Sequence, residues 1–161
     1  MSPAPQVARS AGRKTAITLS DTFVVDRWRT DLLAFINRHI DLVFANDGEL
    51  MSLFQTDNLM KAVSYLKGHA DLAFITRGAE GSLIAKIDHT YTVKAVPVET
   101  VVDTTGAGDQ YAAGVLFGLT QGLPVETCAE LGHVAAAEVI GHYGPRPQVS
   151  LRDLAVKAGL I

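Results

Sequence analysis

Residue types that could do chemistry gather in one stretch, Asp103-Thr104-Thr105-Gly106-Ala107-Gly108-Asp109, which we call the glycine turn. The apolar residues Tyr111, Val115 and Leu119 follow it at helical spacing, so the glycines lie where a helix begins. The first turn of a helix has backbone N–H groups without partners inside the helix, and the helix dipole is positive there. The glycine turn is therefore a candidate anion site.

The glycines and the carboxylate that ends the turn together indicate one kind of reaction. Because glycine has no Cβ, an oxyanion or phosphate could approach the amides of Gly106, Ala107 and Gly108 closely. Asp109 would repel that phosphate unless its role were to take a proton from an incoming hydroxyl. The spacing thus favours activation of a hydroxyl beside a phosphoryl group.

A purely structural interpretation of the same stretch stays open. Asp103, Thr104, Thr105 or Asp109 could cap the helix, with the glycines serving only to turn the chain. Two other phosphate motifs are excluded. A P-loop needs Gly-Lys-Ser/Thr, which is absent, and the dinucleotide fingerprint needs Gly or Ala where Tyr111 stands.

The composition is that of a globular domain. The 161 residues suffice for one domain with a real core; 48% are hydrophobic, 19% are charged, and the net charge is −3. Without a basic tract beyond residues 9–14, nucleic acid is not expected as a partner, and no apolar run reaches the length of a membrane span. Residues 1–14 are expected to be irregular and lack a secretory signal, so we expect a cytoplasmic protein. Cys128 stands alone, which favours a buried small apolar role.

The remaining elements alternate between buried strands and amphipathic helices, which predicts an α/β fold with ligands at the strand ends. A hairpin is expected around Asp88 and His89, and His89 is more typical of a surface turn than of a metal ligand. Pro97 predicts that residues 95–98 are an edge or irregular segment. We expect strands over 14–20, 42–45, 72–76, 82–87 and 90–93, and helices over 28–40, 59–66, 110–119, 125–140 and 151–158.

The glycine turn resembles the C-terminal signature of the ribokinase and phosphofructokinase-B (pfkB) group of sugar and nucleoside kinases. With Gly144-Pro145-Arg146-Pro147-Gln148, it looks most like the bacterial adenosine kinase and related sugar kinase branch. The likeness runs from about Thr15 to the C-terminus and covers the later half of the family pattern. It implies a three-layer α/β/α sheet, ATP as phosphate donor, Asp109 as catalytic base and residues 106–108 as the anion hole.

The resemblance also implies roles for two other segments. Asn46 and Glu49 match an Asn-x-x-Glu segment that organises Mg²⁺-bound phosphate, here expected through water, although Asn46 could simply cap the next helix. Thr76, Gly78 and Gly81 match a Thr-x-Gly-x-x-Gly turn that meets the nucleotide, ATP or ADP. Those glycines could equally serve a tight turn alone.

Three further residues receive roles from the resemblance. The helix around His133 indicates a histidine that only packs inside the protein. Family members, however, place a polar residue beside adenine at this point. Asp103 and Thr105 match a site for a monovalent cation such as K⁺, together with backbone carbonyls near Val139, His142 and Gly144.

The chain matches only the later half of the family pattern, so the acceptor site is expected to be largely missing and the sheet truncated on its N-terminal side. Residues 15–19 would then form an exposed sheet edge, through which the chain could self-associate. Small nucleosides or sugars are the expected substrates. The alternatives to a kinase are a nucleotide-binding module without catalysis and a truncated product that binds nothing.

Overall fold

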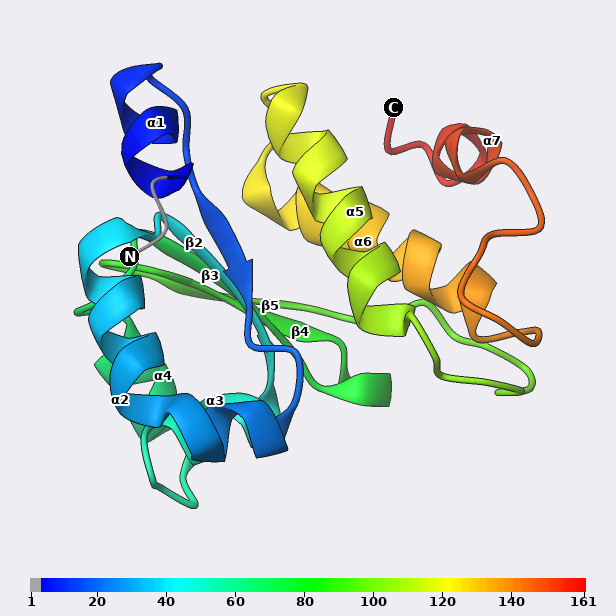
Figure 1. Cartoon of the computed structure of the whole chain (residues 1–161). Coiled ribbons are helices and arrows are strands. Elements are labelled where there is room, and N and C mark those ends of the chain that lie inside the picture. Colours follow the sequence, from blue (N-terminus) through cyan, green and yellow to red (C-terminus); the bar gives the residue numbers. More distant parts are fainter. Residues whose placement is uncertain (1–3) are drawn as a thin grey trace. The chain divides into compact units, whose positions relative to one another are not determined.

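Strands and helices alternate along the first half of the chain, as the apolar pattern predicts (Figure 1). The computed structural model describes residues 4–161. Contacts divide the chain into two units, the first formed by residues up to Thr76 with residues 85–90, and the second by residues 77–84 with 91–161. The strand order in the sheet is β1-β2-β3-β4-β5, so β1 lies at one edge.

Three parallel strands form the centre of the first unit: β1 (Ala16–Thr18), β2 (Leu42–Asn46) and β3 (Leu72–Thr76). Val43 of β2 is the register partner of Ile17 on one side and of Ala73 on the other. Val43 and Phe74 are fully buried. Strands covered on both faces read as unbroken apolar runs, which explains why the sequence located β2 and β3 closely.

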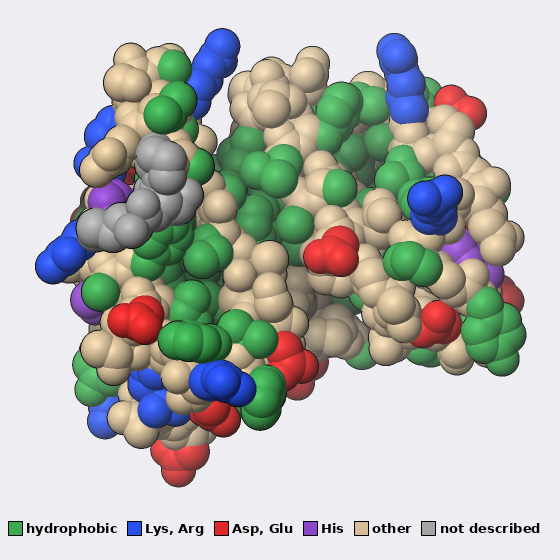
Figure 2. Space-filling model, in the orientation of Figure 1, with side chains coloured by type: hydrophobic (Ala, Val, Ile, Leu, Met, Phe, Trp, Pro, Cys, Tyr) green, Lys and Arg blue, Asp and Glu red, His purple; other side chains and the backbone are tan. Residues whose placement is uncertain are grey.

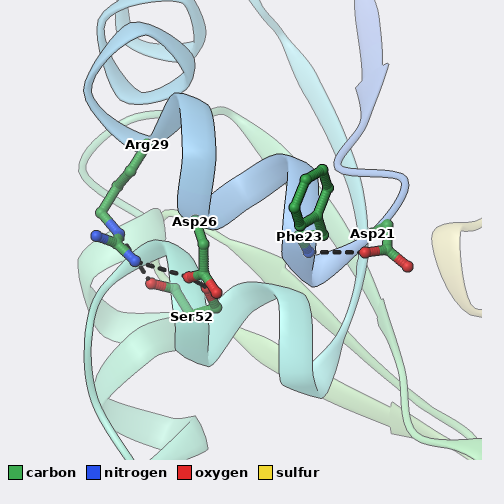
Figure 3. Close-up of polar contacts among 5 residues, drawn as sticks. All are labelled: Asp21, Phe23, Asp26, Arg29 and Ser52. Carbon is green, nitrogen blue, oxygen red and sulfur yellow. Dashed lines mark hydrogen bonds and ion pairs between the residues drawn. The ribbon is translucent and has the colours of Figure 1, made fainter.

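The helices of the first unit are α1 (Ala4–Ser10), α2 (Thr22–His39), α3 (Asp47–Leu53) and α4 (Leu59–Leu66). The expectation of an irregular N-terminus is wrong for Ala4–Ser10, and residues 1–3 lie outside the described residues. Helix α2 begins at Thr22 rather than at Trp28, because the Asp21 carboxylate accepts a hydrogen bond from Phe23 N at 2.7 Å and caps it (Figure 3). Strand β1 ends at Thr18, earlier than expected. Ser20, two residues later, has a left-handed φ of 69°, which does not continue a strand.

A polar cluster ties α2 to the end of α3 (Figure 3). Asp26 pairs with Arg29 at 2.8 Å and accepts a hydrogen bond from the Ser52 hydroxyl. Arg29 Nε donates to the Ser52 carbonyl at 3.2 Å. Helix α3 is therefore held at its C-terminal end by α2, which leaves its N-terminal end to be fixed by its own cap.

The second unit contains the 3₁₀ turn η1 (Gly78–Glu80) and the helices α5 (Ala107–Thr120), α6 (Val125–Val139) and α7 (Leu151–Lys157). The chain first passes between the units after Thr76, and passes again within the strands β4 (Ser82–Lys86) and β5 (Thr90–Val93). Helices α5 and α6 lie side by side (Figure 1). A Cβ on Gly114 would lie 2.6 Å from the Leu131 carbonyl, so this pair of helices packs backbone against backbone.

Smaller expectations agree with the structure. Cys128 is fully buried against Gly118, and His89 lies exposed in the turn between β4 and β5, where its carbonyl accepts a hydrogen bond from Lys86 N. None of the helices within residues 4–161 is long and apolar enough to span a membrane. Lys and Arg side chains are scattered over the face that Figure 2 shows.

Candidate active site

The glycine turn leads directly into α5, as the sequence predicts. Gly106 is the N-cap residue and has a left-handed backbone, with φ of 79° and ψ of 0°. A Cβ at Gly106 would lie 2.5 Å from Pro145 Cβ, so both the backbone and the neighbouring loop require glycine there. Because the cap residue has no side chain, nothing from it occupies the amides of the first helical turn.

The amides of this turn differ in what they bind. The Ala107 N–H donates to the Thr104 carbonyl at 3.2 Å, so this one of the three predicted anion donors is engaged within the turn. No residue within 4–161 accepts a hydrogen bond from the backbone N–H of Gly108 or Asp109. A Cβ at Gly108 would meet nothing within 4 Å. The helix start therefore has open donors beside open space.

Asp109 stands in the first turn of α5 with its side chain exposed. None of the described residues donates a hydrogen bond to its carboxylate or forms an ion pair with it. The carboxylate is thus available to accept a proton from a molecule bound next to the open amides.

The loop over residues 142–148 supports the glycine turn through several contacts. The two carboxylate oxygens of Asp103 accept hydrogen bonds from Thr105 N at 2.9 Å and Gly144 N at 3.1 Å. The pKa of Asp103 is lowered mainly by a hydrogen bond from the Thr105 side chain. The backbone amides of Thr105 and Gly144 lower it further. Gln110 Nε2 donates to the Pro145 carbonyl at 3.1 Å. The cation role predicted for Asp103 and Thr105 stays a prediction, since these bonds serve the turn itself.

Glu138 of α6 holds the other side of this loop. Its Oε1 accepts hydrogen bonds from Gln148 N at 2.8 Å and from His142 Nε2 at 3.2 Å. Its side chain is 7% exposed, and Oε2 is buried without a hydrogen-bond partner among the described residues. Glu138 thus holds both ends of the loop, at His142 and Gln148, and Asp103 holds it in between, at Gly144.

The predicted nucleotide turn precedes β4. Arg77 N donates to the Gly81 carbonyl at 2.8 Å and closes it, and the Arg77 and Glu80 side chains form an ion pair. Gly81 has φ of 91°, and a Cβ there would overlap the Val93 carbonyl, so packing alone explains this glycine. Gly78 faces open space, because a Cβ there would meet nothing within 4 Å.

A buried hydrogen-bonded group joins the residue after this turn to both long helices. Tyr111 Oη donates to Ser82 Oγ at 2.8 Å, and Ser82 Oγ lies 3.0 Å from His133 Nε2. The Tyr111 and His133 rings meet edge to face with centroids 4.9 Å apart. Burial lowers the pKa of His133 to about 4 and raises that of Tyr111. His133 is therefore neutral at pH 7, and its Nε2 is engaged inside the protein.

Asn46, Glu49 and Thr76 belong to the first unit. Asn46 and Thr76 are register partners at the ends of β2 and β3, as expected for neighbouring parallel strands. Asn46 Oδ1 accepts from Glu49 N at 2.8 Å, and the Glu49 oxygens accept from Asn46 N at 2.9 Å and Asn46 Nδ2 at 2.8 Å. This capping box gives both residues a structural role at the start of α3.

Glu49 is an unusually buried carboxylate, with 6% of the residue exposed. Burial raises its pKa, the Asn46 amide opposes the rise, and the nearby Asp21 and Asp47 carboxylates add to it. Within residues 4–161 no three His, Cys, Asp or Glu side chains are placed to hold a metal ion. The water-mediated magnesium contact expected for Asn46 and Glu49 stays a prediction.

The sequence-predicted residues are divided between the two units. Residues 103–109, Gly78, Gly81 and His133 belong to the second unit, and Asn46, Glu49 and Thr76 belong to the first. Sequence reasoning did not find Ser82 or Tyr111 as site residues. Their partners lie 51 and 29 residues away along the chain, and no local pattern signals such contacts.

Comparison with known proteins adds family and fold. Residues 4–151 match the model of the pfkB family of carbohydrate kinases. A cytidine kinase from Thermococcus kodakarensis is 33% identical over 141 residues, which are 84% of this chain and 50% of that protein. The chain spans about half the length of the curated relatives it matches.

Two solved structures resemble nearly the whole chain. The probable sugar kinase from Rhizobium etli has a TM-score of 0.96 and 43% identity, covering 98% of this chain and 48% of that one. The adenosine kinase from Sinorhizobium meliloti has a TM-score of 0.95 and 45% identity, covering 96% of this chain and 48% of that one. The mixed α/β sheet with its helices is thus a ribokinase-like fold, as the resemblance of the glycine turn implies.

Proposed function

Because the chain belongs to the pfkB family of carbohydrate kinases, we propose that it is the nucleotide-binding part of a cytoplasmic, ATP-dependent kinase. The acceptor is a hydroxyl of a nucleoside or sugar, the substrate classes in the names of its relatives. One observation carries the proposal. The start of α5 has open amides at Gly108 and Asp109, free space at Gly108, and an exposed carboxylate at Asp109.

In this proposal the residues of the glycine turn have different roles in the reaction. Asp109 takes the proton of the acceptor hydroxyl as the hydroxyl oxygen forms a bond to the γ-phosphorus, and the bond from that phosphorus to ADP breaks. The Gly108 amide and the positive end of the α5 dipole stabilise negative charge on the phosphoryl oxygens. Gly106 keeps the turn in the conformation that leaves those donors open.

Asn46 and Glu49 are proposed to contact magnesium-bound phosphate through water. Both Glu49 oxygens already accept hydrogen bonds from Asn46, and each oxygen has a further lone pair for a water molecule. Mg²⁺ bound there would offset part of the phosphate charge. Thr76 and Gly78 are proposed to contact the nucleotide, and the monovalent cation near Asp103 and Thr105 stays a prediction.

Calorimetric titration with Mg-ADP tests the nucleotide site. We expect wild type to bind, and Gly108→Val to bind at least tenfold more weakly, because its side chain would fill the space beside the open amides. Ala113→Val is the matched control, since it adds methyl groups to an exposed position one turn further along α5. Binding that survives in Gly108→Val would remove the anion site from the proposal.

The base is tested separately with Asp109→Asn. We expect nearly unchanged Mg-ADP affinity and loss of phosphate transfer in any version of the protein that turns over, because the amide cannot accept the hydroxyl proton. Turnover retained by Asp109→Asn would reject the base assignment.

A nucleotide-binding module without catalysis is the second candidate. The chain spans about half the length of its relatives, which is the observation that favours it. Mg-ADP binding without phosphorylation of adenosine, cytidine or ribose would support the module over the kinase.

A further inference from the structure

The turn before β4 and the helix that carries Asp109 are joined by a buried side-chain group that the proposed reaction does not use. Ser82 is the first residue of β4 and directly follows Gly81. Tyr111 lies on α5 two positions after Asp109, and His133 lies on α6. Ser82 is fully buried, Tyr111 is 2% exposed and His133 is 6% exposed. Water is therefore largely excluded from the hydrogen bonds between them.

The order of protons in this group follows from the number of donors and acceptors. Tyr111 donates to Ser82 Oγ, and the Ser82 hydroxyl makes no other side-chain hydrogen bond to the described residues except the one with His133 Nε2. If His133 donated from Nε2, the Ser82 oxygen would accept twice and its own buried hydrogen would have no acceptor. Leaving such a polar group unpaired is costly. The arrangement that satisfies every member has Tyr111 donating to Ser82 and Ser82 donating to Nε2.

We infer that Tyr111, Ser82 and His133 form a proton-ordered positioning triad that aligns the turn over residues 78–81 with the start of α5. The triad holds His133 in the tautomer with its proton on Nδ1. Nδ1–H is then the polar hydrogen that His133 can offer to a ligand. The effect on nucleotide binding rests on the proposed function, whereas the proton order does not.

The triad fixes the position of the turn over residues 78–81 relative to the start of α5, the two parts of the proposed nucleotide site. Removing the Ser82 hydroxyl breaks both hydrogen bonds at once, and the turn then keeps only its backbone and packing contacts to α5. A site that must hold a ligand within a fraction of an ångström loses affinity when its supporting contacts loosen. Ser82 and Tyr111 therefore act as positioning residues.

The tautomer is measured first, with histidine-ring ¹H–¹⁵N spectra of the full chain at pH 7. The chain has five histidines, and the His133→Gln spectrum identifies the signal of His133. We expect Nδ1 to be protonated and Nε2 to be an acceptor in wild type, and Ser82→Ala to shift His133 to a mixture of tautomers. A wild-type His133 protonated on Nε2, or a signal that Ser82→Ala leaves unchanged, would overturn the triad.

Mg-ADP titration of the same proteins measures the positioning effect. We expect Ser82→Ala and Tyr111→Phe to weaken binding about tenfold, the factor that one buried hydrogen bond is worth. Tyr65→Phe is the surface control because Tyr65 is 45% exposed and lies outside the candidate site. Leu131→Ala is the stability control, since it truncates a side chain of α6 that is only 5% exposed and lies outside the triad.

The controls separate positioning from general loss of stability. Leu131→Ala is expected to lower the melting temperature with unchanged Mg-ADP affinity and an unchanged His133 signal. Equal affinities for wild type and Ser82→Ala would reject the positioning role. If wild type binds no Mg-ADP, the proposed function fails, and the tautomer of His133 alone decides whether the triad exists.

Discussion

Two helices in this chain, α3 and α5, begin beside candidate site residues. They differ in whether the backbone N–H groups of their first turns have hydrogen-bond partners. Helix α3 follows β2 and closes its N-terminus with the Asn46–Glu49 capping box. Helix α5 follows the glycine turn, and its N-cap residue, Gly106, has no side chain to offer. The N-terminus of α3 is satisfied by its own side chains, whereas that of α5 leaves the amides of Gly108 and Asp109 open among the described residues.

The difference distinguishes a cap from a binding site. A capped start contributes to stability because each polar group has a partner in the folded chain. An open start forgoes that contribution and keeps its donors and the helix dipole for an anion. Substitutions at the start of α3 should therefore change stability, and those at the open part of α5 should change binding.

Gly106→Val should be the most destabilising single change. Valine would have to adopt φ of 79°, and its Cβ would lie 2.5 Å from that of Pro145. Strain and overpacking together should lower the free energy of unfolding by about 3 kcal/mol. Urea unfolding followed by circular dichroism measures it. A loss below 1 kcal/mol would mean that the turn can relax, and that Gly106 is not fixed by its backbone.

Asn46→Ala should cost about 1 to 2 kcal/mol, because it removes the cap of α3 and leaves the buried Glu49 carboxylate without the Asn46 side-chain donor. Asn46→Ser is the control for the cap itself, since the serine hydroxyl can accept the hydrogen bond from Glu49 N without placing a second carboxylate beside Glu49. The same urea titrations compare the two variants. Equal stability of Asn46→Ala and wild type would show that the box contributes nothing at the start of α3.

The buried Glu49 gives the capped helix a pH dependence. Its pKa in the folded chain lies above the unfolded value of 4.5, so the folded state binds the proton more tightly. The stability from this group is full below pH 4.5 and is lost as the pH rises through the folded pKa. Relative to Glu49→Gln, which does not titrate, wild type should therefore lose stability between pH 4 and pH 8. A stability difference that is constant over this range would contradict the rise in pKa.

The sequence located the regular elements where the apolar pattern was strong. The helix over 59–66 and the strand over 72–76 agree with α4 and β3. The start of α2 was placed too late, at Trp28, because the Asp21 cap that begins the helix at Thr22 was not recognised. The apolar residues Phe23, Val24 and Trp28 at this end of the helix are not buried. They are 69%, 37% and 51% exposed, and Trp28 has a non-helical φ of −118°. Helix α1 was missed because its proline, Pro5, and its small residues carry little periodicity.

In the candidate site, too, the sequence predicted the features that neighbouring residues set and missed those that depend on distant contacts. Gly106 and the start of α5 followed from local spacing, because a helix N-terminus and its cap are set by neighbouring residues. Sequence spacing did not distinguish the Ala107 amide, which binds Thr104, from the open amide of Gly108. The Ser82 hydroxyl gave no signal at all, because its role depends on contacts made only after β4, α5 and α6 have packed together.

Gly108→Ala should have the smallest effect on stability, and for that reason it tests the comparison most sharply. The position has ordinary helical backbone, and a Cβ there meets nothing within 4 Å, so stability should change by no more than about 0.5 kcal/mol, in favour of alanine. Its Mg-ADP affinity should nevertheless fall, because the methyl group narrows the space beside the open amide. If Gly108→Ala were stabilised and still bound Mg-ADP as wild type does, the open start of α5 would be only an uncapped helix.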